Sequence, residues 1–123
     1  MPKIEIKIER DQNLFIIRKD KNFDHLISLS IVFYERIMSF MQKTEGVSLQ
    51  MNPKFVSLLQ KITTNSEKLY LSQEDITIFV DWVDCLCLIM LDIDSIDYAN
   101  KDIKKYLTLS ERFIKKSKEL MAV

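Results

Sequence analysis

The segment from Ile76 to Ile93 is the longest apolar stretch of the chain, and it limits what the chain can fold into. It contains Asp81, Asp84 and Asp92, and each of these carboxylates would be costly in hydrocarbon, which argues against a membrane span. On a helical wheel its polar arc is narrow and the rest of its circumference is apolar. We therefore expect a helix that lies at the centre of a bundle or buries a second face against a partner.

Three other segments show the 3.6-residue periodicity of amphipathic helices. Asn52 followed by Pro53 provides an N-cap residue and a first-turn proline, and Ser72 with Asp75 forms a shortened capping box before the apolar segment. The chain has one glycine and two prolines in 123 residues, whereas all-β domains use many of both in their turns, so this composition favours helices. The three helices are expected over residues 24–45, 53–62 and 98–121.

The start of the chain has the period of a β-strand instead. Residues 3–9 alternate strictly, with Ile4, Ile6 and Ile8 on one face, and residues 14–17 are apolar on both faces. The polar residues between them suit a turn, so the simplest interpretation is a hairpin. Because a two-stranded hairpin is marginal in water, we expect it to pack on the helices or to pair with another chain.

These patterns together predict a single domain over residues 1–123 in the α+β class, predominantly α. An N-terminal β-hairpin in residues 1–21 is expected to pack on a bundle of about four helices in residues 22–123. The first five residues lack the apolar core of a signal peptide, so we expect a cytoplasmic protein with no membrane association.

Net charge is zero, with 18 basic and 18 acidic residues, but the charges are unevenly placed. Residues 72–97 contain seven carboxylates and no basic residue, whereas residues 98–123 contain seven basic and three acidic residues. We expect these two helices to lie antiparallel and to pair their rims, at about 0–1 kcal/mol for each exposed pair. The alternative is that one of the two charged faces meets a partner.

Residues with catalytic or metal-binding chemistry are few. His25, the only histidine, falls on the polar side of its helix, near Arg36 and Lys43 on the helical wheel, so we expect it to be solvated. Cys85 and Cys87 would point about 200° apart on a helix, and we expect both to be reduced core residues. We therefore expect no cofactor, no metal and no catalytic residue.

One short segment has a family resemblance. Residues 79–86, Phe-Val-Asp-Trp-Val-Asp-Cys-Leu, resemble the second acidic motif of the all-α nucleoside triphosphate pyrophosphohydrolases. The resemblance implies that Asp81 and Asp84 bind Mg²⁺. That family's first motif has paired glutamates on an earlier helix, whereas residues 24–45 offer only Glu35 on the polar face.

By elimination, the sequence favours a non-enzymatic protein-interaction module, such as a small adaptor, inhibitor or regulatory subunit, that self-associates as a dimer. The first alternative is a nucleic-acid-binding protein that uses the basic face of the C-terminal helix, although a duplex-binding domain usually has a basic excess. The second is an Mg²⁺-dependent hydrolase of the family above. The candidate interaction surface comprises Ile4, Ile6, Ile8, Leu88, Leu91, Lys104, Lys105 and Lys115.

Overall fold

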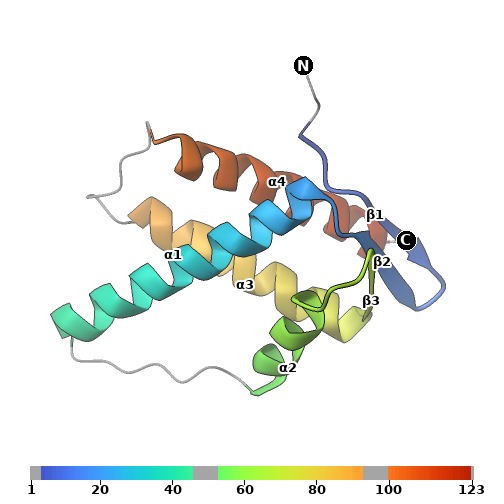
Figure 1. Ribbon diagram of the computed structural model, residues 1–123, viewed down its shortest axis with the longest axis horizontal. Helices are drawn as coiled ribbons and strands as arrows, with labels where there is room; N and C mark the ends of the chain where they lie inside the picture. The colour runs from blue at the N-terminus through green and yellow to red at the C-terminus, as the bar shows by residue number, and fades with distance from the viewer. Residues whose placement is uncertain (1–3, 46–52, 93–99, 123) are drawn as a thin grey trace.

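The computed structural model describes residues 4–45, 53–92 and 100–122, and it confirms a predominantly helical α+β fold that begins with a β-hairpin. Three helices run side by side, and a small sheet lies across one end of them (Figure 1). The elements in chain order are β1 (Ile8–Asp11), β2 (Leu14–Arg18), α1 (Lys21–Glu45), α2 (Pro53–Ile62), β3 (Lys68–Ser72), α3 (Gln73–Asp92) and α4 (Lys101–Met121).

The hairpin has a two-residue turn at Gln12 and Asn13, and Gln12 takes a left-handed backbone with φ of 54°. Hairpin turns of this length need such a conformation to match the twist of the strands. The β1 ladder begins at Ile8, later than the alternation from residue 3 predicts. One hydrogen bond extends the pairing, because the Arg18 N–H donates to the Lys7 carbonyl at 3.0 Å.

A third strand was missing from the sequence-based expectation. β3 pairs antiparallel with β2, so β2 is the central strand of the order β1-β2-β3. Leu69 and Leu71 point into the core while Lys68, Tyr70 and Ser72 are exposed. The hairpin therefore obtains its third strand from this chain rather than from a partner.

The core lies between the sheet and α3, which is the central helix of the bundle. Phe15 and Ile17 of β2 are fully buried beneath the helices, together with Phe79 of α3. The Phe79 ring lies 4.7 Å from the Phe113 ring of α4 and 6.0 Å from the Phe23 ring of α1, measured between centroids. One aromatic cluster thus joins three helices.

Local capping sets where the helices begin. The Asp20 carboxylate accepts a hydrogen bond from the Phe23 N–H at 3.1 Å, so α1 begins at Lys21, three residues before the predicted start. The predicted capping box of α3 is present: the Asp75 N–H donates to the Ser72 hydroxyl at 3.1 Å. The predicted C-terminal cap at Gly46 lies outside the described residues.

The expected pairing between the acidic rim of α3 and the basic rim of α4 is not what the described residues show. The two ion pairs of α3 go to α2 instead: Lys54 lies 2.8 Å from Glu74, and Lys61 lies 3.2 Å from Asp75. The acidic first turn of α3 packs beside α2, so it is already neutralised there. Within residues 4–45, 53–92 and 100–122, the basic side chains of α4 form no ion pair.

Candidate functional site

Two of the three N-terminal residues of the predicted interaction surface, Ile6 and Ile8, are buried. Ile6 and Ile8 are only 2% and 6% exposed, whereas Ile4 is 38% exposed. The alternation correctly places Ile6 and Ile8 on one face, but that face is turned toward the helices. These two side chains are therefore core residues and contribute very little exposed area to an interaction surface.

On α3 the prediction of exposed apolar surface is more accurate. Leu88 is 57% exposed and Ile89 is 38% exposed, and the Cys85 side chain one turn earlier is also exposed. These three residues, Cys85, Leu88 and Ile89, are called the α3 patch below. Leu91 lies in the last turn of α3, but its side chain is outside the described residues.

The expectation that both cysteines are core residues is wrong for Cys85. α2 is ten residues long and packs on the first half of α3, where the Phe55 ring lies 4.4 Å from the Trp82 ring. Cys85 and Leu88 follow beyond that contact. Trp82 itself is half-buried, and its Nε1 atom is buried without a hydrogen-bond partner among the described residues.

Hydroxyl and thiol groups meet in the interior between α1, α3 and α4. The Ser30 hydroxyl donates to the Tyr106 hydroxyl at 2.8 Å, and burial raises the pKa of Tyr106 to about 12. Burial also raises the pKa of Cys87, a shift that the neighbouring Ser110 hydroxyl opposes and the Asp84 carboxylate adds to. A thiol with a raised pKa stays protonated at neutral pH and is a poor nucleophile.

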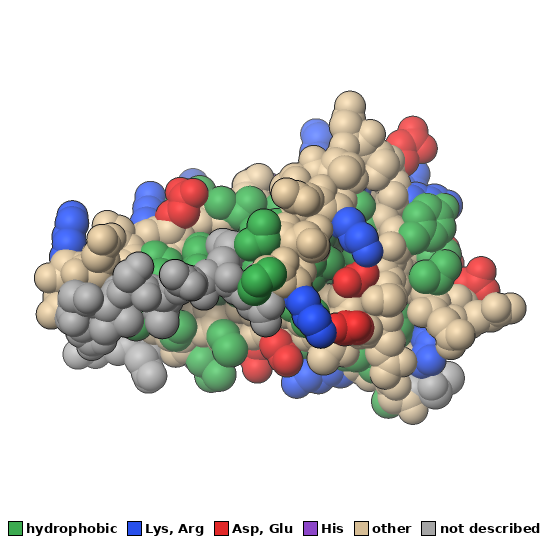
Figure 2. Space-filling model, turned by 90° about the horizontal axis from the view of Figure 1, so that it is seen from below, with side chains coloured by type: hydrophobic (Ala, Val, Ile, Leu, Met, Phe, Trp, Pro, Cys, Tyr) green, Lys and Arg blue, Asp and Glu red, His purple; other side chains and the backbone are tan. Residues whose placement is uncertain are grey.

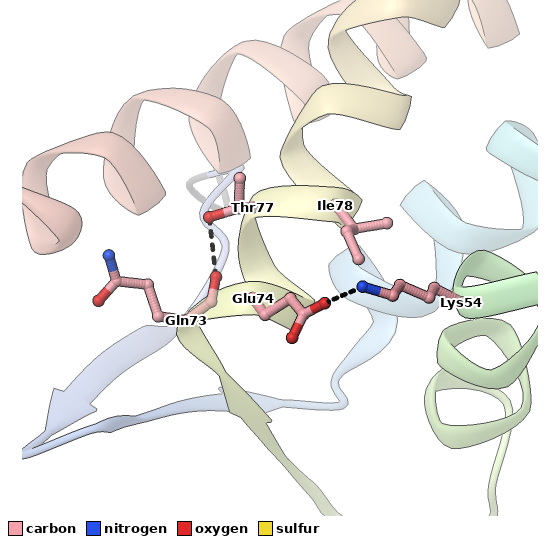
Figure 3. A pocket seen from close by; sticks show the side chains of 5 residues that line it. All are labelled: Lys54, Gln73, Glu74, Thr77 and Ile78. Carbon is pink, nitrogen blue, oxygen red and sulfur yellow. Dashed lines mark hydrogen bonds and ion pairs between the residues drawn. The ribbon is translucent and has the colours of Figure 1, made fainter. Parts of the chain in front are cut away.

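The carboxylates implied by the hydrolase resemblance, Asp81 and Asp84, lie on α3 together with Glu74. Glu74 points toward Lys54 across the mouth of a shallow hollow, while the Thr77 hydroxyl donates to the Gln73 carbonyl at 2.8 Å (Figure 3). Asp81 is exposed, and in the described ranges no three His, Cys, Asp or Glu side chains are grouped so as to hold a metal ion. In that part of the chain, Asp81 and Asp84 are therefore not joined by a third side chain of these types in such a group.

The basic residues predicted on the C-terminal helix are split between two places. Lys104 is exposed and Lys105 half-buried near the start of α4. Lys115 lies roughly 16 Å farther along the helix axis, where it lines a hollow with Arg112 and Lys116 against the N-terminal segment. Lys104 and Lys105 do not line this hollow.

The outer face of the sheet is a site that sequence reasoning missed. Leu14 is 44% exposed and Tyr70 is 58% exposed, and Ile16 between them is half-buried. Apolar side chains are visible over this end of the molecule, with basic side chains beside them (Figure 2). A hollow of about 260 Å³ adjoins them and is lined by Glu5, Lys7, Ile8, Glu9, Ile16, Arg18, Lys68 and Lys116.

Comparison with models of known protein families, with characterised proteins and with solved structures finds no match for this chain. None of the helices in the described ranges combines the length and the apolar character required to cross a membrane.

Proposed function

We propose that the protein is a non-enzymatic protein-interaction module, in the manner of an adaptor, an inhibitor or a regulatory subunit, and that it self-associates through the α3 patch. The observation that carries this proposal is the exposure of Leu88 and Ile89, at 57% and 38%, on the helix that is otherwise the centre of the core. Side chains of this kind lose unfavourable contact with water when a second surface covers them.

A second copy is the occupant that fits the α3 patch best. The patch is apolar, and an apolar patch is complementary to itself across a two-fold axis, which is the commonest symmetry of oligomers. The zero net charge of the chain removes the general repulsion that keeps many identical domains apart. Cys85, Leu88 and Ile89 would then face their counterparts in the other protomer.

Light scattering coupled to size exclusion tests the proposal over a tenfold dilution series at micromolar concentration. We expect a mass of two chains of 14.6 kDa each, which falls toward one chain on dilution. Leu88→Glu should give the mass of one chain throughout, because it places a charge at the centre of the patch. Val56→Glu is the matched control, since Val56 is an apolar α2 residue that is 40% exposed outside the patch.

Two results would contradict the proposal. The unmodified protein could have the mass of one chain at every concentration, or Val56→Glu could dissociate the dimer as completely as Leu88→Glu does. Circular dichroism of both variants establishes that they keep the helical fold.

A further inference from the structure

Three basic residues from distant parts of the sequence lie in one row on the outer face of the sheet. The pairing of Ile8 with Ile17 places Lys7 opposite Arg18, and the Arg18 N–H donates to the Lys7 carbonyl at 3.0 Å. Arg18 is in turn the partner of Lys68 in the β2–β3 ladder. Lys7, Arg18 and Lys68 are called the cationic row below, and all three side chains are exposed.

The fold does not neutralise the cationic row. Like charges directly opposite each other across two strands are destabilising, and in the part of the chain that the structure describes none of the three forms an ion pair. Lys116 of α4 lines the same hollow, along with two carboxylates, Glu5 and Glu9. Four cations against two anions leave the hollow with a formal charge of +2, which suits an anionic ligand.

Two apolar side chains lie next to the cationic row. Ile16 is opposite Tyr70 on β3 and opposite Glu9 on β1, and each of the three is two residues along its strand from the cationic row, about 7 Å away. The Tyr70 side chain is 58% exposed, so its ring is accessible to a ligand. A row of cations beside an exposed aromatic ring combines the two contacts that single-stranded nucleic acids use, phosphate pairing and base stacking.

The basic surface continues from the sheet onto α4. A second hollow, of about 280 Å³, lies between the N-terminal segment and α4, and it shares Glu5 and Lys116 with the first. Arg112 and Lys115 add two cations to its lining, and Glu119 adds one carboxylate. The two adjoining hollows therefore offer a path for successive phosphates rather than a site for a single ion.

We propose that the outer face of the sheet binds single-stranded nucleic acid. The cationic row and Lys116 pair with phosphates, and a base stacks on the ring of Tyr70 against Ile16. A duplex is excluded from this arrangement, because its bases are already stacked inside the helix and cannot reach Tyr70. The site is separate from the α3 patch, so its existence does not depend on self-association.

Fluorescence anisotropy with a labelled oligothymidylate of about twelve nucleotides tests the proposal, since single-strand sites span about 4–16 nucleotides. We expect binding at low salt, with a slope of log K against log salt of about −3 for four phosphate contacts. Lys68→Gln should weaken binding at least about fivefold and reduce the slope by about 0.7. Tyr70→Ala should weaken binding about tenfold, whereas Tyr70→Phe should retain it, because stacking needs only the ring.

Lys104→Gln is the matched charge control, because Lys104 is an exposed lysine that lines neither hollow. A duplex of the same length and a polyglutamate peptide are the ligand controls. The proposal is overturned if the oligothymidylate does not bind at low salt, or if Lys104→Gln weakens binding as much as Lys68→Gln. If the Tyr70→Ala variant binds the duplex as tightly as it binds the oligothymidylate, the surface makes only nonspecific phosphate contacts. If polyglutamate binds the unmodified protein as tightly as the oligothymidylate does, the ligand of the surface is an acidic polypeptide.

Discussion

The cationic row leads to a stability prediction that is independent of any ligand: Lys68→Glu should stabilise the protein. In the ladder, Lys68 lies directly opposite Arg18, so the substitution replaces a repulsive pair with an attractive one. A cross-strand charge pair contributes roughly 0.2–1 kcal/mol. Because both side chains are exposed and screened by water, we take a total gain of about 0.5–1 kcal/mol in the free energy of unfolding.

Urea unfolding at low ionic strength measures this gain. The fluorescence of Trp82, the only tryptophan, reports on the transition, because its ring packs against Phe55 and Tyr34. At about 1 M salt the Debye length falls to about 3 Å, so most of the gain should disappear. The same substitution in an Arg18→Gln background should bring much less stabilisation, because the opposite charge is gone.

The reasoning is refuted if Lys68→Glu is neutral or destabilising at low salt, or if its effect is the same with Gln at position 18. Either result would mean that the two side chains do not interact across the ladder. If the prediction holds, the variant would be more stable and yet bind the oligonucleotide more weakly, a combination that a purely structural lysine would not produce.

Three further predictions concern side chains of α3 and α4. Trp82→Ala should lower the free energy of unfolding by about 2–4 kcal/mol, because the Trp82 ring packs against three aromatic residues. Trp82→Phe should lower it by less than about 1 kcal/mol, since this change removes an N–H that is buried without a partner among the described residues. Chemical unfolding of the two variants measures both values. Burial raises the folded-state pKa of Tyr106 to about 12 from 10.0, so the free energy of unfolding should be intact below pH 10 and decline as pH rises toward 12. Tyr106→Phe should reduce this decline, which urea titrations at each pH measure. Cys85 should react with a maleimide faster than Cys87, since Cys85 is exposed while burial raises the pKa of Cys87; mass spectrometry of time points shows the order, and equal rates would contradict it.

Much of the fold was predictable because its signals are local. The capping box at Ser72 and Asp75 and the proline at the start of α2 depend on residues within one turn of each other, and the structure contains both. The hairpin follows from alternation around a short polar turn. Each of these signals depends on the backbone geometry of a few neighbouring residues, so no tertiary information is needed to find it.

Other features arise only when distant segments meet. Residues 68–72 become a strand because β2 offers an edge to pair with, and a five-residue segment next to a capping box does not reveal that in isolation. Likewise, periodicity correctly grouped Ile6 with Ile8 but could not tell which side of the sheet the helices would cover. Cys85 is exposed because the short α2 packs on the first half of α3, a matter of helix placement rather than composition.

Of the two candidate surfaces, the α3 patch follows from a local sequence signal and the cationic row follows from tertiary structure. The sequence by itself determined that α3 carries more apolar surface than one core face requires, because amphipathicity is a property of a single helix. The tertiary structure alone decided that Lys7, Arg18 and Lys68 form a row beside Tyr70. Arg18 and Lys68 are separated by the whole of α1 and α2 in the chain, and only the register of the strand pairing places them opposite each other.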